Sequence, residues 1–372
     1  MASRTVDLVA IGPPPTDPFA PAARAWALAR ALVRRGDRVS VLYPEGPEGD
    51  RVPEGVTALP IAVPLRRPGT PFADAEFAGV VGRRLHREAA LVLREPAGLG
   101  ALGVRGPRLI VFAHGAEFLE FDAAAGGGAF LDRLDRWRDR RSLHRLERAA
   151  LSEAEAIFCD GPALLETLQT EYGLPRERMR VSLPPVPDLP AGPSRAEARG
   201  SLGIPPDVPA VVVPAFSDRA EENGLALARE AFGRIRALFP GVRLILVGAT
   251  ATAEPGTVGL PRRDGSSFAL AFSAADVALV IPTRTGFDPA AVFAMRAGCA
   301  TIAAATVVLP AVPEGAVRVP VSADAGDVAS VLAELVADPA ACRELGARGR
   351  KYAQGFDPER TLAEVDAALG GR

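Results

Sequence analysis

Residues 6–43 read VDLVAIGPPPTDPFAPAARAWALARALVRRGDRVSVLY and decide the class of the fold. Residues 6–11 form a short apolar run, which predicts a buried β-strand. The alanine-rich stretch 21–35 predicts an amphipathic helix that ends at Gly36, and residues 39–43 predict the next strand. A strand, a helix and a second strand in this order predict two parallel strands joined by a right-handed crossover.

The same alternation continues along the rest of the chain. Further elements of the first half are strands at 109–113 and 156–159 and helices at 142–151 and 162–172. Those of the second half are strands at 210–213, 244–248, 277–281 and 301–304 and helices at 225–239, 289–297, 327–336, 339–352 and 358–369. The pattern predicts two doubly wound α/β halves.

Two domains are also expected from the length of 372 residues, because a single hydrophobic core stops growing below this size. The segment 183–193, LPPVPDLPAGP, contains five prolines and one glycine and predicts a linker. We therefore predict an N-terminal domain at 1–183, a linker at 184–193 and a C-terminal domain at 194–355. Periodicity alone leaves a binding protein of the periplasmic type, a dehydrogenase and a glycosyltransferase open.

The composition narrows the class of protein. Apolar residues make up 48% and charged residues 24%, a globular mixture. The net charge of −2 argues against a dedicated nucleic-acid binder, which would show a basic excess. Cys159, Cys299 and Cys342 lie far apart without the spacing of metal ligands, so we expect a reducing cytoplasm and no metal site. An uncharged apolar stretch of transmembrane length is absent from the sequence, so no transmembrane segment is expected.

Four segments resemble family-4 glycosyltransferases in their order and spacing. They are LERAALSEAEAIFCDGPALLETLQTEYGLPRERMRVSLPPV at 146–186, EAFGRIRALFPGVRLILVG at 230–248, AFSAADVALVIPTRTGFDPAAVFAMRAGCATIAA at 271–304 and ELGARGRKYAQGFDPERTLAEVDAAL at 344–369. The resemblance covers nearly the whole chain.

The resemblance implies a GT-B fold, in which two Rossmann-like domains face each other across a cleft. Residues 356–372 would form a C-terminal helix that crosses back to the N-terminal domain. The second domain would bind a nucleotide-sugar donor as substrate, and the acceptor would approach from the first. The reaction would be transfer with retention at the sugar carbon, without a metal or other cofactor.

The family's cationic pair for the diphosphate falls in residues 211–224, VVVPAFSDRAEENG. Asn223 stands at the lysine position, and Asp218 or Phe216 stands at the arginine position, depending on the register. Arg219 is the only base in this loop, and acidic residues surround it. A developing diphosphate charge needs cations nearby, so the loop fits a donor only if Arg219 turns toward it.

A second family signature, two glutamates around a glycine-phenylalanine-glycine turn, falls in residues 282–298. Gly286 and Phe287 match this turn, whereas Thr285 stands where the first glutamate is expected. Asp288 is a substitute carboxylate in this reading. The alternative for Asp288 is a helix N-cap, which the following proline favours.

Two further donor contacts are altered. Phe293 stands at the position of the ribose-binding glutamate, and we expect it to pack in the core. Gly12 opens the loop where the family has a glycine-rich turn near the phosphates. Pro13, Pro14 and Pro15 follow it and carry no backbone N–H that could bind phosphate.

The acceptor side matches better. His114 and Gly115 follow the strand predicted at 109–113, as the family's histidine-glycine pair does. By this resemblance His114 is the candidate catalytic residue, which binds or orients an acceptor hydroxyl.

The four altered donor contacts favour a homologue that has lost standard nucleotide-sugar transfer. Its role would be to partner an active glycosyltransferase or a second copy of itself, or to bind a glycan or nucleotide without turnover. The alternative is an active enzyme with a donor site rebuilt from arginines, because arginine binds phosphate well. These arginines are Arg219, Arg262, Arg263 and Arg284. A small-molecule binding protein of other ancestry is disfavoured by the ordered family segments.

Overall fold

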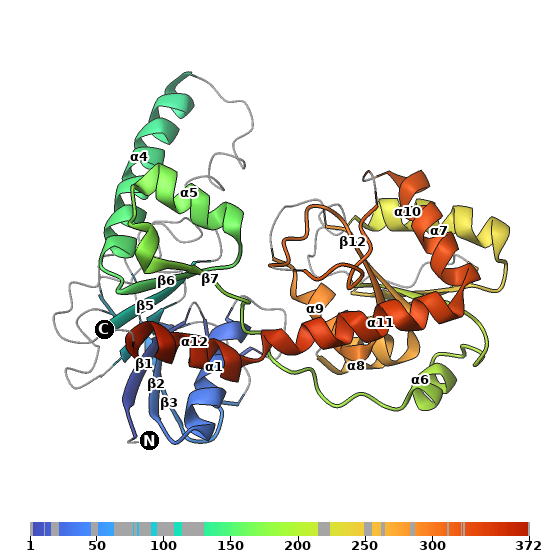
Figure 1. Ribbon diagram of the computed structural model, residues 1–372, viewed down its shortest axis with the longest axis horizontal. Coiled ribbons are helices and arrows are strands. Elements are labelled where there is room, and N and C mark those ends of the chain that lie inside the picture. Colours follow the sequence, from blue (N-terminus) through green and yellow to red (C-terminus); the bar gives the residue numbers. More distant parts are fainter. Residues whose placement is uncertain are drawn as a thin grey trace. The chain divides into compact units, whose positions relative to one another are not determined.

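The structure is a computed structural model with two compact α/β units (Figure 1). Among the described residues, unit 1 comprises those at 3–185 and 358–370, and unit 2 comprises those at 186–357. The residues described are 3–10, 12–15, 22–45, 51–62, 77, 80–81, 91–94, 108–113, 130–214, 224–248, 255–261, 265–282, 287–310, 312–320, 322 and 324–370.

Unit 1 contains a seven-stranded sheet in its described part, in the order β3-β2-β1-β4-β5-β6-β7. All of its strand pairs are parallel. The strands are β1 (Thr5–Val9), β2 (Arg38–Pro44), β3 (Val56–Ile61), β4 (Leu91–Arg94), β5 (Arg108–Ala113), β6 (Ala156–Cys159) and β7 (Met179–Val181).

Helices cover both faces of this sheet. On β5, Ile110 and Phe112 pack with α1 (Ala23–Arg34) and α12 (Pro358–Gly370), whereas Leu109 and Val111 pack with α4 (Phe130–Ser152) and α5 (Pro162–Tyr172). Because successive side chains of a strand point to opposite faces, a strand covered on both sides needs a continuous apolar run. The sequence RLIVFA of β5 meets this demand.

The last helix, α12, is part of the core of unit 1. Leu362 and Val365 are each 1% exposed and pack in the same cluster as Trp26 of α1. Asp366 accepts a hydrogen bond from Arg4 at 2.8 Å and another from Arg35. The residues after unit 2 therefore complete a hydrophobic core that begins at the N-terminal end of the chain.

Unit 2 contains a five-stranded sheet in its described part, again with parallel pairs, in the order β10-β9-β8-β11-β12. In Figure 1, α7 and α10 lie on one side of it and α8 and α9 on the other. The strands are β8 (Ala210–Pro214), β9 (Arg243–Val247), β10 (Thr257–Leu260), β11 (Val277–Val280) and β12 (Ala300–Ala303). The helices are α6 (Arg195–Ser201), α7 (Leu225–Leu238), α8 (Gly265–Ala274), α9 (Pro289–Ala297), α10 (Ala325–Ala337) and α11 (Pro339–Ala353), followed by the 3-10 turn η2 (Gln354–Phe356).

The predicted fold class, two doubly wound α/β units, is confirmed. The sequence analysis missed β3, β7 and β10, which form edges of the two sheets, as well as the short strand β4. Most side chains of β3, β7 and β10 are exposed or partly exposed, so these strands lack a continuous apolar run. Pro60 in β3 is tolerated because an edge strand needs fewer N–H donors. Helix α8 was missed because FALAFSA is apolar on nearly all sides and shows no helical period. The predicted linker, 184–193, contains neither helix nor strand.

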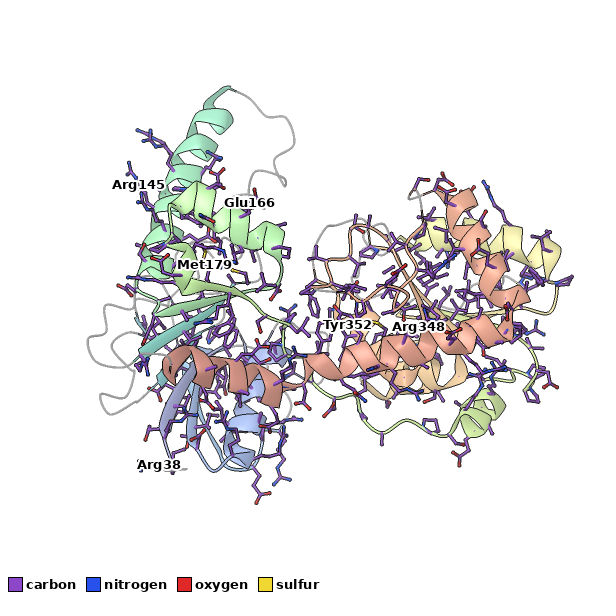
Figure 2. The ribbon with its side chains drawn as sticks, viewed as in Figure 1. Arg38, Arg145, Glu166, Met179, Arg348 and Tyr352 are labelled. Atoms are coloured by element: carbon purple, nitrogen blue, oxygen red, sulfur yellow. The ribbon has the colours of Figure 1, made fainter. Side chains whose placement is uncertain are left out.

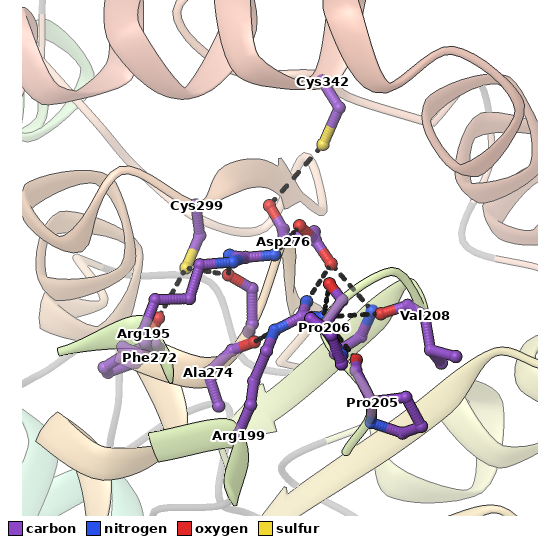
Figure 3. A network of polar contacts seen from close by, with 12 residues as sticks. Arg195, Arg199, Pro205, Pro206, Val208, Phe272, Ala274, Asp276, Cys299 and Cys342 are labelled. Carbon is purple, nitrogen blue, oxygen red and sulfur yellow. Dashed lines mark hydrogen bonds and ion pairs between the residues drawn. The ribbon is translucent and has the colours of Figure 1, made fainter. Parts of the chain in front are cut away.

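A network of polar contacts around Asp276 and the buried Arg199 fixes the amino ends of the unit 2 strands (Figure 3). Asp276 precedes β11, and its carboxylate accepts hydrogen bonds from the backbone N–H of Ala210 at 2.9 Å and from Arg199 at 2.7 Å. Arg199 is 3% exposed and also donates to the carbonyls of Pro205, Pro206, Val208 and Ala274. This single guanidinium therefore holds the proline-containing turn after α6 against the sheet.

Replacing Arg199 by alanine is expected to lower the free energy of unfolding of unit 2 by about 2–4 kcal/mol, because the ion pair with Asp276 and the hydrogen bonds of a buried guanidinium to four carbonyls are lost. Arg195→Ala is the matched control, since Arg195 also pairs with Asp276 but its side chain is 47% exposed. Its cost is expected to stay below about 1 kcal/mol. Hydrogen exchange of the β8 and β11 amides measures both, and equal effects would contradict the assignment.

The attachment of α12 predicts a pH dependence of unit 1. Burial opposes the charge on Asp366, but hydrogen bonds from Arg4 and Arg35 outweigh it and lower the pKa of this carboxyl. A carboxyl whose pKa is lowered by folding stabilises the folded state at pH values above its ordinary pKa of about 3.9. This stabilisation is lost as the pH falls below that value.

Asp366→Asn is therefore expected to destabilise unit 1 by about 1–2 kcal/mol at neutral pH, with a difference from wild type that shrinks below about pH 4. Tryptophan fluorescence during urea unfolding reports on this unit, since Trp26 and Trp137 both belong to it. Glu359→Gln on the same helix is the control, because Glu359 and Arg34 have side chains 40% and 58% exposed. An Asp366→Asn effect no larger than this control would contradict the prediction.

Candidate functional site

Each parallel sheet has one edge at which all of its strands end, and ligands of open α/β folds bind there, at the point where the strand order reverses. In unit 2 the chain leaves β8 toward β9 and β10 and later returns to β11 and β12. The reversal therefore lies between β8 and β11. The segments that follow these strands lead into α7 and α9, so the first turns of these helices border the candidate site.

The start of α7 lies close to the end of β11. Gly224, the N-cap of α7, has a φ of 62°, and a Cβ atom there would stand 2.1 Å from the carbonyl oxygen of Ile281. Only glycine fits a left-handed residue against a backbone oxygen at this distance. Gly224 has no side chain, so the N-cap residue itself offers no side-chain acceptor to the first-turn N–H groups of α7.

The start of α9 is occupied by a carboxylate. Asp288 is its N-cap, and Oδ1 accepts a hydrogen bond from the backbone N–H of Ala290 at 2.9 Å. The first helical residue, Pro289, has no N–H group. The predicted N-cap role of Asp288 is confirmed. A negative charge already stands where the helix dipole would otherwise attract an anionic ligand.

The two phenylalanines of the candidate donor segment make apolar contacts. The Phe287 ring stacks on Phe356 with ring centroids 5.7 Å apart and an interplanar angle of 26°. Phe293 is 1% exposed, and its expected place in the core is confirmed. An aromatic side chain at this position accepts no hydrogen bond from a ribose hydroxyl.

Most of the other predicted site residues lie outside the described part of the chain. Their roles in donor or acceptor binding stay predictions. They are His114, Gly115, Arg219, Arg284, Thr285 and Gly286, together with Arg262 and Arg263 of the alternative donor site.

In unit 1 the strand order reverses between β1 and β4, and Gly12 lies just beyond β1. Its carbonyl oxygen accepts a hydrogen bond from Nε1 of Trp26 at 3.0 Å. A Cβ atom at Gly12 would make only an ordinary contact, 3.7 Å from Ala22. The conformation of this loop therefore does not require glycine, and the prolines after Gly12 offer no N–H donors to a phosphate.

Sequence analysis missed a polar pair at this edge of unit 1. Arg24 of α1 donates from Nη1 to Oδ2 of Asp160 at 3.2 Å, with side chains 16% and 9% exposed. The backbone N–H of Asp160 also donates to the carbonyl of Ala113, the residue before His114. A carboxylate directly after the buried run at 156–159 was the available signal.

A cysteine nucleophile is excluded next to this pair. Cys159 is the last residue of β6 and is 0% exposed. Burial and the neighbouring charge of Asp160 raise the pKa of its thiol to about 12. The thiolate that a nucleophile requires is therefore not formed near neutral pH.

Comparisons with known proteins identify the fold. Residues 22–188 match the family described as Glycosyltransferase Family 4. The chain has the GT-B fold, and the match to this family lies almost entirely in its first unit. No curated protein matches the sequence.

Several solved structures share this GT-B fold over nearly their whole length. Sucrose-phosphate synthase from Thermosynechococcus elongatus is 17% identical with a TM-score of 0.70, and the match covers 99% of both chains. WaaG, a glycosyltransferase involved in lipopolysaccharide biosynthesis, is 19% identical with a TM-score of 0.71 over 98% of this chain and 99% of its own. HepE from Anabaena, solved in complex with UDP, is 16% identical with a TM-score of 0.69 over 98% of this chain and 100% of its own.

The described residues show neither a metal-binding cluster nor a membrane-spanning helix. They contain no group of three or more histidine, cysteine, aspartate or glutamate side chains that could hold a metal ion. No helix within them is long and apolar enough to cross a membrane.

The contact at Gly224 predicts the effect of one methyl group. Gly224→Ala is expected to destabilise unit 2 by at least about 1–2 kcal/mol, because alanine is strained at this φ and its Cβ meets the Ile281 carbonyl. Gly233→Ala in the same helix is the control, since Gly233 has open space around it. This substitution should stabilise α7 by about 0.5–1 kcal/mol, because alanine is a better helix former than glycine. Hydrogen exchange of the β8 amides distinguishes the two, and a neutral Gly224→Ala would overturn the assignment.

Proposed function

We propose that this chain is a family-4-like glycosyltransferase homologue that has lost standard transfer from a nucleotide-sugar donor. Its role is that of a partner or regulator in glycan or glycoconjugate biosynthesis. It would act beside an active glycosyltransferase or a second copy of itself, or bind a glycan without turnover. We propose a cytoplasmic location, in line with cysteines that are all free and buried.

The observation that carries the proposal is the carboxylate at the start of α9. A leaving diphosphate needs converging positive charge or free N–H donors. Asp288 instead supplies a negative charge and bonds the N–H of Ala290, and Pro289 removes the preceding donor. Like charges within about 4–6 Å repel each other, so the carboxylate of Asp288 disfavours a diphosphate at the first turn of α9.

Two further observations agree with it. Phe293 is buried in the core where a ribose-binding carboxylate was expected. In unit 1, the prolines that follow Gly12 carry no N–H groups for phosphate. Each of these changes removes a different kind of donor contact.

One observation favours the alternative, an active retaining glycosyltransferase with a donor site rebuilt from arginines. The N-cap of α7, Gly224, has no side chain that would bond the first-turn N–H groups, and this helix start borders the same reversal point, where a helix N-terminus attracts phosphate. HepE, which shares the fold, was solved in complex with UDP. In this alternative Arg219 and Arg284 bind the diphosphate, the nucleotide sugar is the substrate and no cofactor is needed.

A calorimetric titration of the full chain with UDP, GDP and their common sugar conjugates at moderate salt separates the two functions. We expect no measurable binding, that is, a Kd weaker than about 1 mM. HepE titrated with UDP under the same conditions is the positive control.

Micromolar binding of any of these nucleotides would overturn the proposal. If Arg219→Ala or Arg284→Ala then abolished that binding while Arg180→Ala did not, the arginine-based enzyme would replace it. Arg180 is a suitable control because it is exposed on β7 in unit 1.

A further inference from the structure

Arg296, at the end of α9, binds both segments by which the chain enters and leaves unit 2. Its Nη1 donates to the carbonyl oxygens of Val186 at 3.1 Å and Pro187 at 2.8 Å. Its Nη2 donates to the carbonyl oxygen of Phe356 at 3.1 Å. Unit 2 begins at Val186 and ends one residue after Phe356. One planar guanidinium therefore joins the two crossings.

The two crossings are also bonded to each other. The backbone N–H of Val186 donates to the carbonyl oxygen of Phe356 at 3.0 Å, and Val186 is 0% exposed. Arg296 also lies 3.3 Å from the carboxylate of Asp188, but that side chain is 93% exposed. An exposed ion pair contributes little, so the carbonyl contacts are the important ones.

Phe356 connects these crossings to the carboxyl edge of the sheet. Its ring stacks on Phe287, which precedes α9, and meets the ring of Tyr352 edge-on at 5.2 Å. Tyr352, labelled near the end of α11 in Figure 2, donates its hydroxyl hydrogen bond to the carbonyl of Pro310, beyond β12. The segment after β11 thus contacts Phe356 directly, and the segment after β12 is linked to it through Tyr352.

Helix α9 is a stiff connection between these groups. It has nine residues, about 13 Å, and all six side chains from Ala290 to Met295 are buried. Its N-cap is Asp288, beside Phe287, and Arg296 lies in its last turn. A close-packed interior transmits displacement, so the helix cannot absorb a shift of one end by bending.

We propose that Arg296, Phe356 and Val186 form a latch that fixes both chain crossings to unit 2 and couples them to the segment before α9. The latch confines the points at which the chain can bend to residues 183–185 and 357. A rearrangement at Phe287 would loosen both crossings together. This inference does not depend on the proposed function, because every contact lies within unit 2 and none involves a ligand.

Hydrogen exchange of the Val186 amide in the full chain tests the latch, because this N–H bonds across the two crossings. We expect slow exchange in the wild type and an increase of at least about tenfold in Arg296→Met, which keeps the stem but removes the donors. Arg350→Met is the matched control, since Arg350 donates to Ala297 at the end of the same helix but contacts neither crossing. It should leave the Val186 rate unchanged.

The amides of β11 report on opening of the whole unit. An Arg296→Met increase confined to the crossings supports the latch. An unchanged Val186 rate, or an equal increase at Val186 and β11, overturns it. If Arg296→Met does not fold, Arg296→Lys decides by the same criteria, because lysine keeps the charge but lacks the planar fork.

A separate variant tests whether the two crossings are coupled to the carboxyl edge of the sheet. Phe287→Ala removes the ring stacked on Phe356 and should raise the Val186 exchange rate about threefold or more. Phe239→Ala, beyond the far end of α7, controls for the loss of a partly buried ring in the same unit. An equal response to both variants would show that the crossings are not coupled to the Phe287 segment.

Discussion

Parallel pairing of the strands is the constraint on which the rest of this structure depends. Two parallel neighbours cannot be joined by a tight turn, so the chain must return through a longer crossover, which in most cases here contains a helix. All strands then end at one edge of the sheet, and the helices that follow them begin there. The charge at that edge and the N–H groups it offers depend on how each helix start is capped. In unit 2, α7 begins with a glycine against the Ile281 carbonyl, and α9 begins with the carboxylate of Asp288.

The sequence predicted the features that depend on neighbouring residues. The buried runs of β6 and β11 were recognised because a strand covered on both faces must be apolar throughout. The N-cap at Asp288 was recognised because an aspartate directly before a proline is typical of a helix start. The Arg24–Asp160 pair joins residues 136 positions apart, and no local pattern announces such a contact. The edge strands β3, β7 and β10 were missed for a different reason, since most of their side chains are exposed or partly exposed and no continuous apolar run is required.

Arginine has a recurring structural use in this chain, which contains 35 prolines. A proline offers no N–H, so a proline-rich segment leaves carbonyl oxygens that neither helix nor sheet can satisfy. Arg199 binds the carbonyls of Pro205 and Pro206, and Arg296 binds those of Val186 and Pro187. A guanidinium carries five N–H groups in a plane and can serve several carbonyls at once, which a lysine cannot do as well. The irregular segments are thereby fixed without regular secondary structure.

The place of α12 in the core of unit 1 has a consequence for synthesis on the ribosome. Chains emerge from their N-terminal end, and domains usually fold as they appear. Here the sheet of unit 1 is made first, but the helix that buries Leu362 and Val365 against Trp26 follows all of unit 2. Unit 2 can therefore complete its core while the face of unit 1 beside α1 is still uncovered. The unit that is begun first is the last to be finished, and during that interval its uncovered apolar face is available to a chaperone or to a neighbouring chain.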